Sequence, residues 1–364
     1  MPGLPALSIP AMTCGLGEET TPEAYIGHLI LVMREMWRVL RDDGTCFVNL
    51  GDSYASDIKG SGGPSKKQTR NAGSFYSVSQ RLDHGIKPKD LCLIPARFAL
   101  AAQADGWWVR SDIIWAKPNP MPESVTDRPT KAHEYIWLMA KSQRYFYDAE
   151  AVKEDTSSET FARALRGVGE NHKNINGAPG QTVHTMSSPR LHGEGAPANP
   201  TRNRRTVWNI AVGNFPGAHF ATWPPKLVEP MILAGTSARG VCPACGSPWE
   251  RVTENGLTAH DGETDSAYEK GTSANRLALL RQAARERGEE YTSAKQTTGW
   301  RATCECPPAD PIPATVLDPF NGSGTSGTVA LDLGRAYIGV DISTEYVTEL
   351  AEERIGGTQI GFGL

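Results

Sequence analysis

The sequence predicts an α/β protein with a doubly wound, Rossmann-like sheet. Near the N-terminus, an amphipathic pattern of helical period is followed at once by a short apolar run at residues 45–50. Near the C-terminus, a strand, a glycine-rich loop, a helix and a second strand follow one another within residues 314–340. This alternation is typical of sheets that are covered by helices on both faces. With 39% hydrophobic residues among 364, the chain can form a sizeable core.

The first half of the chain shows clear local signals. Thr20-Thr21-Pro22-Glu23 is typical of a helix start, with a threonine cap and a proline in the first turn. Apolar residues at helical spacing continue to Leu40, and Gly44 ends this helix before the strand at 45–50. The further elements predicted in this half are a helix at 93–104 and strands at 107–115 and 134–140.

Composition excludes several classes of protein. The chain has 37 Lys and Arg against 41 Asp and Glu, a formal net charge of −4, which excludes a histone-like polycation. Its 37 glycines and 26 prolines predict long loops. The best apolar run, residues 29–33, is far shorter than the ~18 residues of a membrane span. Because the first basic residue is Arg34, no secretory signal is predicted, and we expect a cytoplasmic protein without a membrane partner.

The C-terminal unit predicts a cofactor site. A strand at 314–318 ends in Asp318, and a second strand at 337–340 is followed by Asp341, 19 positions after Gly322. The loop glycines let a ligand approach the backbone closely, and a carboxylate at the second strand end can bind ribose hydroxyls. Gly327 leaves a dinucleotide open as an alternative. Asp318 disfavours a pyrophosphate and favours a cationic ligand such as the sulfonium of S-adenosylmethionine.

The seven cysteines fall into two groups. Cys14, Cys46 and Cys92 stand singly and are interpreted as small buried hydrophobic residues. The other four form two close pairs, whose thiolates can complete a tetrahedral site at about 2.3 Å from one metal ion. A closed set of four thiolates predicts structural zinc in a zinc-ribbon-like insertion, and a redox pair remains the alternative. The predicted ligands are Cys242, Cys245, Cys304 and Cys306.

The segment Asp318-Pro-Phe-Asn-Gly-Ser-Gly-Thr325 resembles the S-adenosylmethionine motif of the amino DNA methyltransferases, which methylate cytosine N4 or adenine N6. Residues 219–225, 115–135 and 49–54 resemble further segments of that family. The order of the motifs is that of the permuted β group, which includes phage and restriction-modification enzymes. The resemblance covers residues 16–150 and 205–355, and some members carry a cysteine-containing insertion before the cofactor strand.

The resemblance implies a methyltransferase fold that acts on double-stranded DNA with a flipped target base. It divides the chain into a catalytic-side half at 1–150, a loop-rich target-recognition region at 151–214, a cofactor-binding half at 215–240 and 312–364, and the zinc-binding insertion at 241–311. The implied cofactor-binding residues are Asp318, Phe320, Gly322, Gly324 and Thr325 in the loop, Asp341 at the ribose, and Phe220 and Thr222 at the methionine end.

One motif of the family is missing. Its catalytic tetrapeptide, Asp, Asn or Ser followed by Pro-Pro and an aromatic residue, is expected upstream of Thr21. The tetrapeptide accepts hydrogen bonds from the target amine, and its aromatic ring stacks on the flipped base. The nearest segments are Trp223-Pro-Pro-Lys226, Cys306-Pro-Pro-Ala309 and Ser8-Ile-Pro-Ala11, and none has the pattern at the expected place. Residues 1–17 also carry no strand pattern, so the strand that should hold the tetrapeptide is not predicted.

No catalytic residue is therefore assigned. Two explanations stay open: the chain begins at an internal methionine of a longer active enzyme, or it is a decayed gene product. Under both, we expect a retained cofactor pocket and little transferase activity. The rival function is a non-catalytic remnant that binds DNA or the cofactor, and a small-molecule methyltransferase is a third reading. Residues 117–124 resemble cytosine-N4 members slightly more than adenine-N6 members.

Basic segments point to DNA contacts. Residues 162–205 contain seven Lys or Arg and two Glu, a local excess of five positive charges, although a solvated insertion is the alternative. A second basic loop carries Lys59, Lys66, Lys67 and Arg70. Asp52 and Tyr54 follow a central strand and are expected to line the site if the sheet is parallel, or to form a plain turn.

Overall fold

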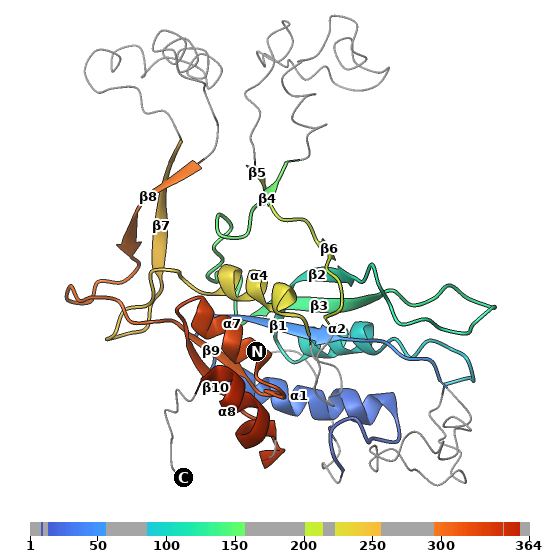
Figure 1. The fold of residues 1–364 in the computed structure, drawn as a ribbon. Coiled ribbons are helices and arrows are strands. Elements are labelled where there is room, and N and C mark those ends of the chain that lie inside the picture. The colour runs from blue at the N-terminus through green and yellow to red at the C-terminus, as the bar shows by residue number, and fades with distance from the viewer. Residues whose placement is uncertain are drawn as a thin grey trace, which may run out of the picture.

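The computed structural model of the protein describes residue 9 and residues 14–55, 86–156, 201–213, 223–255, 295–344 and 346–356 (Figure 1). The main body is built from α1 (Pro22–Val39), β1 (Thr45–Leu50), α2 (Ile94–Ala104), β2 (Trp108–Ala116), β3 (His133–Ala140), α4 (Pro225–Gly235), β9 (Thr315–Asp318), α7 (Thr325–Asp332) and β10 (Ala336–Gly339). Smaller elements are β4 (Glu154–Asp155), β5 (Thr201–Arg202), β6 (Val207–Asn209), β7 (Trp249–Asn255), β8 (Lys295–Ala302), the π-helix η3 (Tyr346–Ala351) and α8 (Glu352–Ile355).

The described strands of the body form two pieces of sheet. One has the order β1-β3-β2-β6, and the other is the parallel pair β10-β9. β3 runs antiparallel to both β1 and β2, whereas β6 pairs parallel to β2. The predicted α/β class is confirmed, but the sheet is mixed, because β2 and β3 are joined by a loop without a crossover helix.

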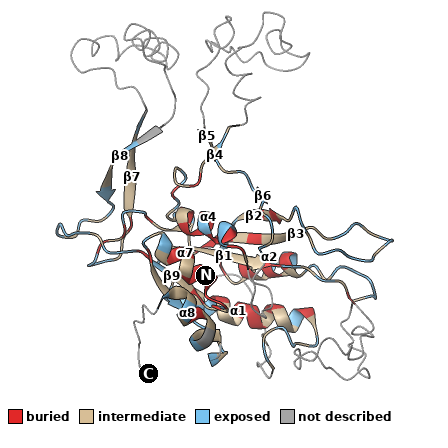
Figure 2. Cartoon of the chain, in the orientation of Figure 1, coloured by how far each residue is buried: buried red, intermediate tan, exposed pale blue. Residues whose placement is uncertain are grey.

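Helices cover both faces of the sheet, which places one hydrophobic cluster on each side. On one face, Leu227 and Met231 of α4 pack with Ile136 of β3 and Val329 of α7. On the other face, residues of α1 and α2 pack with Met139 of β3 and Leu50 of β1. Neighbouring residues of a strand point to opposite faces, so β3 contributes to both clusters. Figure 2 shows the buried residues on the helix surfaces that face the strands.

Helix α1 begins as its sequence predicts. Thr21 is the N-cap, and its hydroxyl accepts a hydrogen bond from the Ala24 backbone N–H at 3.2 Å, while Pro22 occupies the first turn. Its buried residues, which include Ile26, Ile30 and Met33, recur at helical spacing along one face. Local sequence therefore determines both the start of this helix and its buried side.

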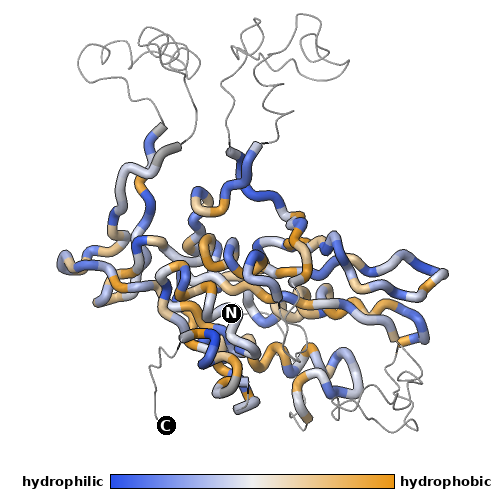
Figure 3. The backbone as a smooth tube through the Cα atoms, viewed as in Figure 1, coloured by the Kyte–Doolittle hydropathy of each residue, from blue (hydrophilic) through white to orange (hydrophobic). Residues whose placement is uncertain are grey.

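Hydropathy separates the body from the segments that project from it. Hydrophobic residues gather in the sheet and its flanking helices, whereas the β7–β8 hairpin and the β4–β5 segment are mainly hydrophilic (Figure 3). Within the described ranges, no helix combines the length and the apolar character needed to cross a membrane.

The β7–β8 hairpin is held to the body by polar contacts. Arg251 of β7 donates from Nη2 to Asp148 Oδ2 at 2.8 Å and from Nε to Oδ1 at 3.2 Å. Only 4% of the Asp148 side chain is exposed. Arg41, after α1, donates from Nη1 to the Cys245 carbonyl at 2.7 Å. The hairpin base therefore depends on a buried carboxylate whose main counter-charge is Arg251.

Replacing Arg251 with alanine should destabilise the protein by about 3–5 kcal/mol, because it leaves the Asp148 carboxylate buried without its guanidinium. The midpoint of urea denaturation measures the loss. Arg301→Ala is the matched control, since the Arg301–Glu250 pair of the same hairpin is exposed and should contribute at most about 1 kcal/mol. Equal losses in the two variants would contradict a supporting role for the buried pair.

Candidate functional site

The loop between β9 and α7 turns sharply at two glycines. Gly322 has φ of 49° and Gly324 has φ of 73°, a left-handed conformation that favours glycine. A Cβ atom on Gly324 would also lie 3.1 Å from the Ala351 Cα. This turn lets α7 begin at Thr325, directly behind the carboxyl end of β9.

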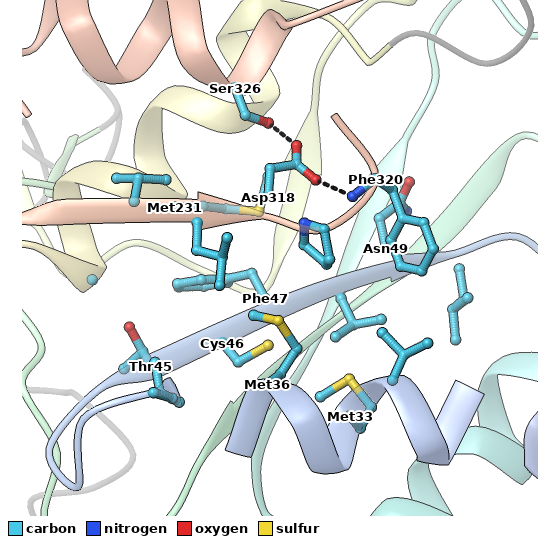
Figure 4. A pocket seen from close by; sticks show the side chains of 18 of the residues that line it. Met33, Met36, Thr45, Cys46, Phe47, Asn49, Met231, Asp318, Phe320 and Ser326 are labelled. Carbon is cyan, nitrogen blue, oxygen red and sulfur yellow. Dashed lines mark hydrogen bonds between the residues drawn. The ribbon is translucent and has the colours of Figure 1, made fainter. Parts of the chain in front are cut away.

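Asp318, the last residue of β9, is buried beside this loop, with 7% of its surface exposed. The Ser326 hydroxyl donates to its Oδ2 at 2.6 Å, and the Phe320 backbone N–H donates to its Oδ1 at 2.9 Å (Figure 4). Burial raises the pKa of the Asp318 carboxyl, and the charge of Asp341 adds to the rise, while the two hydrogen bonds oppose it. A carboxylate in this position is stabilised further by any cation placed next to it.

Asp341 follows β10, and its carboxylate links the end of this strand to the loop after β9 by a hydrogen bond. Its Oδ2 accepts a hydrogen bond from the Gly322 backbone N–H at 2.7 Å, and its Oδ1 accepts one from Ser343 N–H at 2.9 Å. The parallel register pairs Gly339 with Asp318, so the carboxyl ends of β9 and β10 lie side by side. A carboxylate has about four acceptor positions, which leaves room for two ligand hydroxyls.

Two apolar side chains near Asp341 are exposed. The Phe320 residue is 53% exposed and Ile342 is 101% exposed. Sequence reasoning included Phe320 but missed Ile342, whose only signal is an apolar residue directly after the strand-end carboxylate. It also missed Ser326, which hydrogen-bonds Asp318, and Tyr337, whose hydroxyl donates to Asn321 Oδ1 at 2.6 Å.

A cavity of about 1840 Å³ opens between β1 and β9 and is bordered by α1 and α4. Of the predicted cofactor residues, Asp318 and Phe320 line it, whereas Gly322, Gly324, Thr325 and Asp341 lie outside its lining. Cys46 also lines the cavity, and burial raises the pKa of its thiol to about 12. The structure therefore places Asp318 and Phe320 on the lining of a much larger space and the other predicted loop residues outside that lining.

Polar side chains gather where β1 leads into residues 51–55. Lys117 and Glu134 form an ion pair that lines the cavity, and the Lys117 ammonium lies 4.3 Å from the centre of the Trp115 ring. Tyr54 lines the cavity too, with the Arg128 guanidinium 3.9 Å over its ring. Asp52 does not line it, since its Oδ1 accepts from the Ile94 N–H at the start of α2 at 3.1 Å. Of this predicted pair, only Tyr54 reaches the cavity.

The four cysteines of the two predicted pairs lie together. Their Sγ atoms are all within 4.8 Å of one another, and Cys242 is buried. Zinc with four thiolates at about 2.3 Å needs sulfur atoms about 3.8 Å apart, so this group fits a tetrahedral zinc ion after small adjustments.

Several predicted residues fall outside the described residues. They are Phe220 and Thr222, the basic loop of Lys59, Lys66, Lys67 and Arg70, and Arg163, Arg166, Lys173 and Arg190 of the predicted recognition region. Three basic residues of that region are described. Arg202 and Arg205 both donate to Glu154 Oε1, and Arg204 lies over the Trp208 ring at 4.6 Å. Two positive charges of the predicted basic segment are thus paired with Glu154. This carboxylate lies before residue 162, so the charge count over residues 162–205 did not include it.

Comparison with known proteins places the chain in a family. A family model described as DNA methylase matches residues 13–242 and 312–353. The Type II methyltransferase M.Cfr9I of Citrobacter freundii is 33% identical over 342 residues, covering 94% of this chain and 75% of that protein. M.SmaI of Serratia marcescens is 31% identical, covering 93% of this chain and 77% of that protein. Among solved structures, the chain is similar to the PvuII DNA methyltransferase (cytosine-N4-specific), with 13% identity, a TM-score of 0.45, and coverage of 94% and 78%.

The family match spans both the β1 region and the β9–α7 loop, and between them it leaves out residues 243–311. Two relatives above 30% identity cover nearly the whole chain. The protein therefore belongs to the DNA methylase family, the S-adenosylmethionine-dependent amino DNA methyltransferases.

Proposed function

We propose that the protein binds S-adenosylmethionine at the β9–α7 loop and serves methylation of an exocyclic base amine in double-stranded DNA, with cytosine N4 as the target. The observation that carries this proposal is the pair of strand-end carboxylates, Asp318 and Asp341, on either side of a glycine turn in a DNA methylase. The similarity to proteins named Type II methyltransferases supports a restriction-modification role.

The residues around the turn suit the parts of this cofactor. The free acceptor positions of Asp341 suit ribose hydroxyls. The exposed Phe320 ring and Ile342 side chain offer apolar surface to the adenine. Asp318 places a negative charge near the cationic aminoacyl sulfonium. When bound, S-adenosylmethionine supplies the activated methyl group, and the protein's residues position it and exclude water.

Cofactor affinity should fall on acidification at a pH above 3.8, the ordinary pKa of an aspartate. Burial raises the pKa of Asp318, so this carboxyl takes up a proton earlier than an exposed one and loses its attraction for a cation. Calorimetric titrations of S-adenosylmethionine at several pH values measure the trend. Asp318→Asn should bind more weakly and show a flatter profile, and an unchanged slope in this variant would assign the pH dependence to another group.

The target amine also needs the catalytic tetrapeptide, and the described residues contain none. The favoured target, cytosine N4, rests on the resemblance of residues 117–124 to cytosine-specific members. In the structure, Asn119 of this segment accepts a hydrogen bond from the Val212 N–H at 2.9 Å, which ties it to the end of the recognition region. This contact supports a role for the segment at the target base.

A methyl-transfer assay separates the two functions that remain. Radiolabelled S-adenosylmethionine is incubated with this chain and with DNA that contains diverse sites. We expect saturable binding of the cofactor and transfer far below that of a relative such as M.Cfr9I, because the described residues include the proposed cofactor loop but not the catalytic tetrapeptide. Methyl transfer at the rate of that relative would contradict the conclusion that the catalytic tetrapeptide is missing from this sequence. Absence of cofactor binding would contradict the proposed function itself.

A zinc ion held by Cys242, Cys245, Cys304 and Cys306 completes the proposal. The support is the approach of four Sγ atoms to within 4.8 Å from two segments that lie about sixty residues apart in the sequence. With all four positions taken by thiolates, the ion would have a structural role, holding the insertion to the body beside the contact between Arg41 and the Cys245 carbonyl.

A further inference from the structure

Three side chains that can bind a metal come together at the beginning of α1. One ligand atom from each of Cys14, Glu19 and His28 lies within 4.8 Å of the other two. Cys14 and Glu19 belong to the segment that leads into α1, and His28 lies in the helix itself. In the sequence Cys14 stands alone, so only the fold brings it to two further ligands. The group is separate from the four-cysteine group and from the β9–α7 loop.

A tight turn before the helix orients the Glu19 carboxylate. The Glu18 backbone N–H donates to the Gly15 carbonyl at 3.0 Å, which closes the turn. The Gly17 N–H donates to Glu19 Oε2 at 2.7 Å, and Glu19 Oε1 lies 2.7 Å from His28 Nδ1. The backbone therefore holds one carboxylate oxygen while the other is directed at the imidazole. Carboxylates that bind metals are commonly fixed by such a second hydrogen bond.

The charge of this group suits a divalent cation. The side chains of His28 and Glu19 are buried, with 3% and 2% of their surfaces exposed. A carboxylate removed from water is costly unless a positive charge or hydrogen bonds compensate for the lost hydration. Glu19 and a Cys14 thiolate together carry two negative charges, and His28 binds a metal as a neutral imidazole. A Zn²⁺ ion at this position would leave the buried group without net charge.

The second ring nitrogen of His28 does not oppose metal binding at the first. A neutral imidazole carries its proton on one nitrogen and a lone pair on the other. His28 Nε2 is buried and has no hydrogen-bond partner among the described residues. The proton can therefore reside on Nε2 without breaking a hydrogen bond there, and Nδ1 then presents its lone pair beside Glu19 Oε1.

The three donor types and their spacing favour zinc. Thiolate, imidazole and carboxylate are its usual ligands, at about 2.3 Å for sulfur and 2.0–2.2 Å for nitrogen and oxygen, so a tetrahedral ion needs donor atoms about 3.3–3.6 Å apart. Here the His28 Nδ1 to Glu19 Oε1 distance is 2.7 Å, and all three donors lie within 4.8 Å of one another. Small side-chain shifts therefore suffice. Cys14 is only partly buried, which gives an ion access.

We propose that Cys14, Glu19 and His28 form a second zinc site, in which a water molecule takes the fourth position. Binding displaces the proton of the Cys14 thiol to the solvent, because only the thiolate binds the metal. The ion fixes residues 14–19 to α1, and Glu19 lines the cavity between β1 and β9, so one wall of that cavity becomes more rigid. With three protein ligands and a hydrogen bond to replace, this site binds more weakly than the four cysteines and fills when metal is added.

The test titrates the full chain, as purified, with cobalt(II). This ion replaces zinc in tetrahedral sites, and its bonds to thiolates absorb in the near ultraviolet. We expect about one equivalent to bind with an absorption about a quarter as intense as that of a four-thiolate site, because only one sulfur is a ligand. The signal should persist in Cys304→Ser, which disrupts the four-cysteine group, and elemental analysis of each sample gives the zinc that remains bound.

Variants identify the ligands. Loss of even an outer partner of a metal ligand costs about 10–100-fold in affinity, so Cys14→Ser and His28→Gln should each weaken cobalt binding by about 100-fold or more. Cys92→Ser is the matched control, since Cys92 belongs to neither group of ligands and should leave the titration unchanged. Circular dichroism checks folding, and if the buried His28→Gln variant unfolds, Cys14→Ser decides the test.

Three results would overturn the second zinc site: no cobalt bound in Cys304→Ser, a thiolate absorption that survives Cys14→Ser, or an unchanged affinity in folded His28→Gln. The measurements use neither S-adenosylmethionine nor DNA, so their outcome is independent of the proposed methyltransferase function.

Discussion

Asp341→Ala should raise the Kd for S-adenosylmethionine by about 100-fold or more. Hydrogen bonds to a charged group contribute about 1.5–3 kcal/mol each, and the variant loses the carboxylate that would bind two ribose hydroxyls. In the wild type, Asp341 Oδ2 accepts a hydrogen bond from the Gly322 N–H at 2.7 Å. The variant loses this hydrogen bond too, so the glycine turn loses part of its support. Isothermal titration calorimetry of the cofactor, with thermal unfolding as a check on folding, measures the effect.

Two further variants separate the causes of this loss. Asp341→Asn keeps an oxygen that can accept from Gly322 N–H but removes the charge, so it should fall between wild type and Asp341→Ala. Asp332→Ala removes an exposed carboxylate at the end of α7 and should leave the Kd unchanged. If Asp341→Ala binds the cofactor like wild type, the ribose does not lie at the end of β10.

Removal of zinc should be the second large effect. Structural zinc sites bind with apparent free energies of about 10–16 kcal/mol in zinc-finger peptides, and this energy becomes folding energy of the segment that holds the metal. We expect about one zinc ion per chain by elemental analysis. Treatment with a strong chelator should expose the β7–β8 hairpin to trypsin. The body should keep its secondary structure, because its two hydrophobic clusters include no residue of the hairpin.

Cys304→Ser tests the same site without a chelator. The variant loses one of four thiolates and should lose most of its bound zinc and the protease resistance of the hairpin. Cys92→Ser is the matched control, since Cys92 lies outside the four-cysteine group and should not alter the zinc content. A wild-type protein that purifies without zinc and binds none when it is added would contradict the metal site.

The sequence predicted those parts of the protein that depend on neighbouring residues. The cap at Thr21, the strand at 45–50 and the succession of β9, the glycine turn, α7 and β10 are written in short segments with strong propensities. The glycine loop with its two strand-end carboxylates could be predicted for the same reason, because Asp318 and Asp341 lie only 23 residues apart. Short elements without periodicity, such as β6 and η3, were not predicted, since β6 gains its order from pairing with β2.

Contacts between distant segments were decided by the tertiary structure. Asp52, which the sequence places after a central strand, caps α2 because the chain brings Ile94 to it. Glu154 pairs with Arg202 and Arg205 across about fifty residues, which reduces a basic patch that a local count overestimates. No periodic pattern encodes such partners, because they depend on how the elements pack.

By itself, the sequence determined the α/β class, the glycine loop with its two strand-end carboxylates, and the pairing of cysteines that suits a metal. Only the tertiary structure decided the mixed order of the sheet and the cavity between β1 and β9, whose facing edges pair with no other strand among the described residues. The physical reason is that propensity acts over a few neighbouring residues, whereas strand order and unpaired edges arise from hydrogen bonds and packing between segments far apart in the chain.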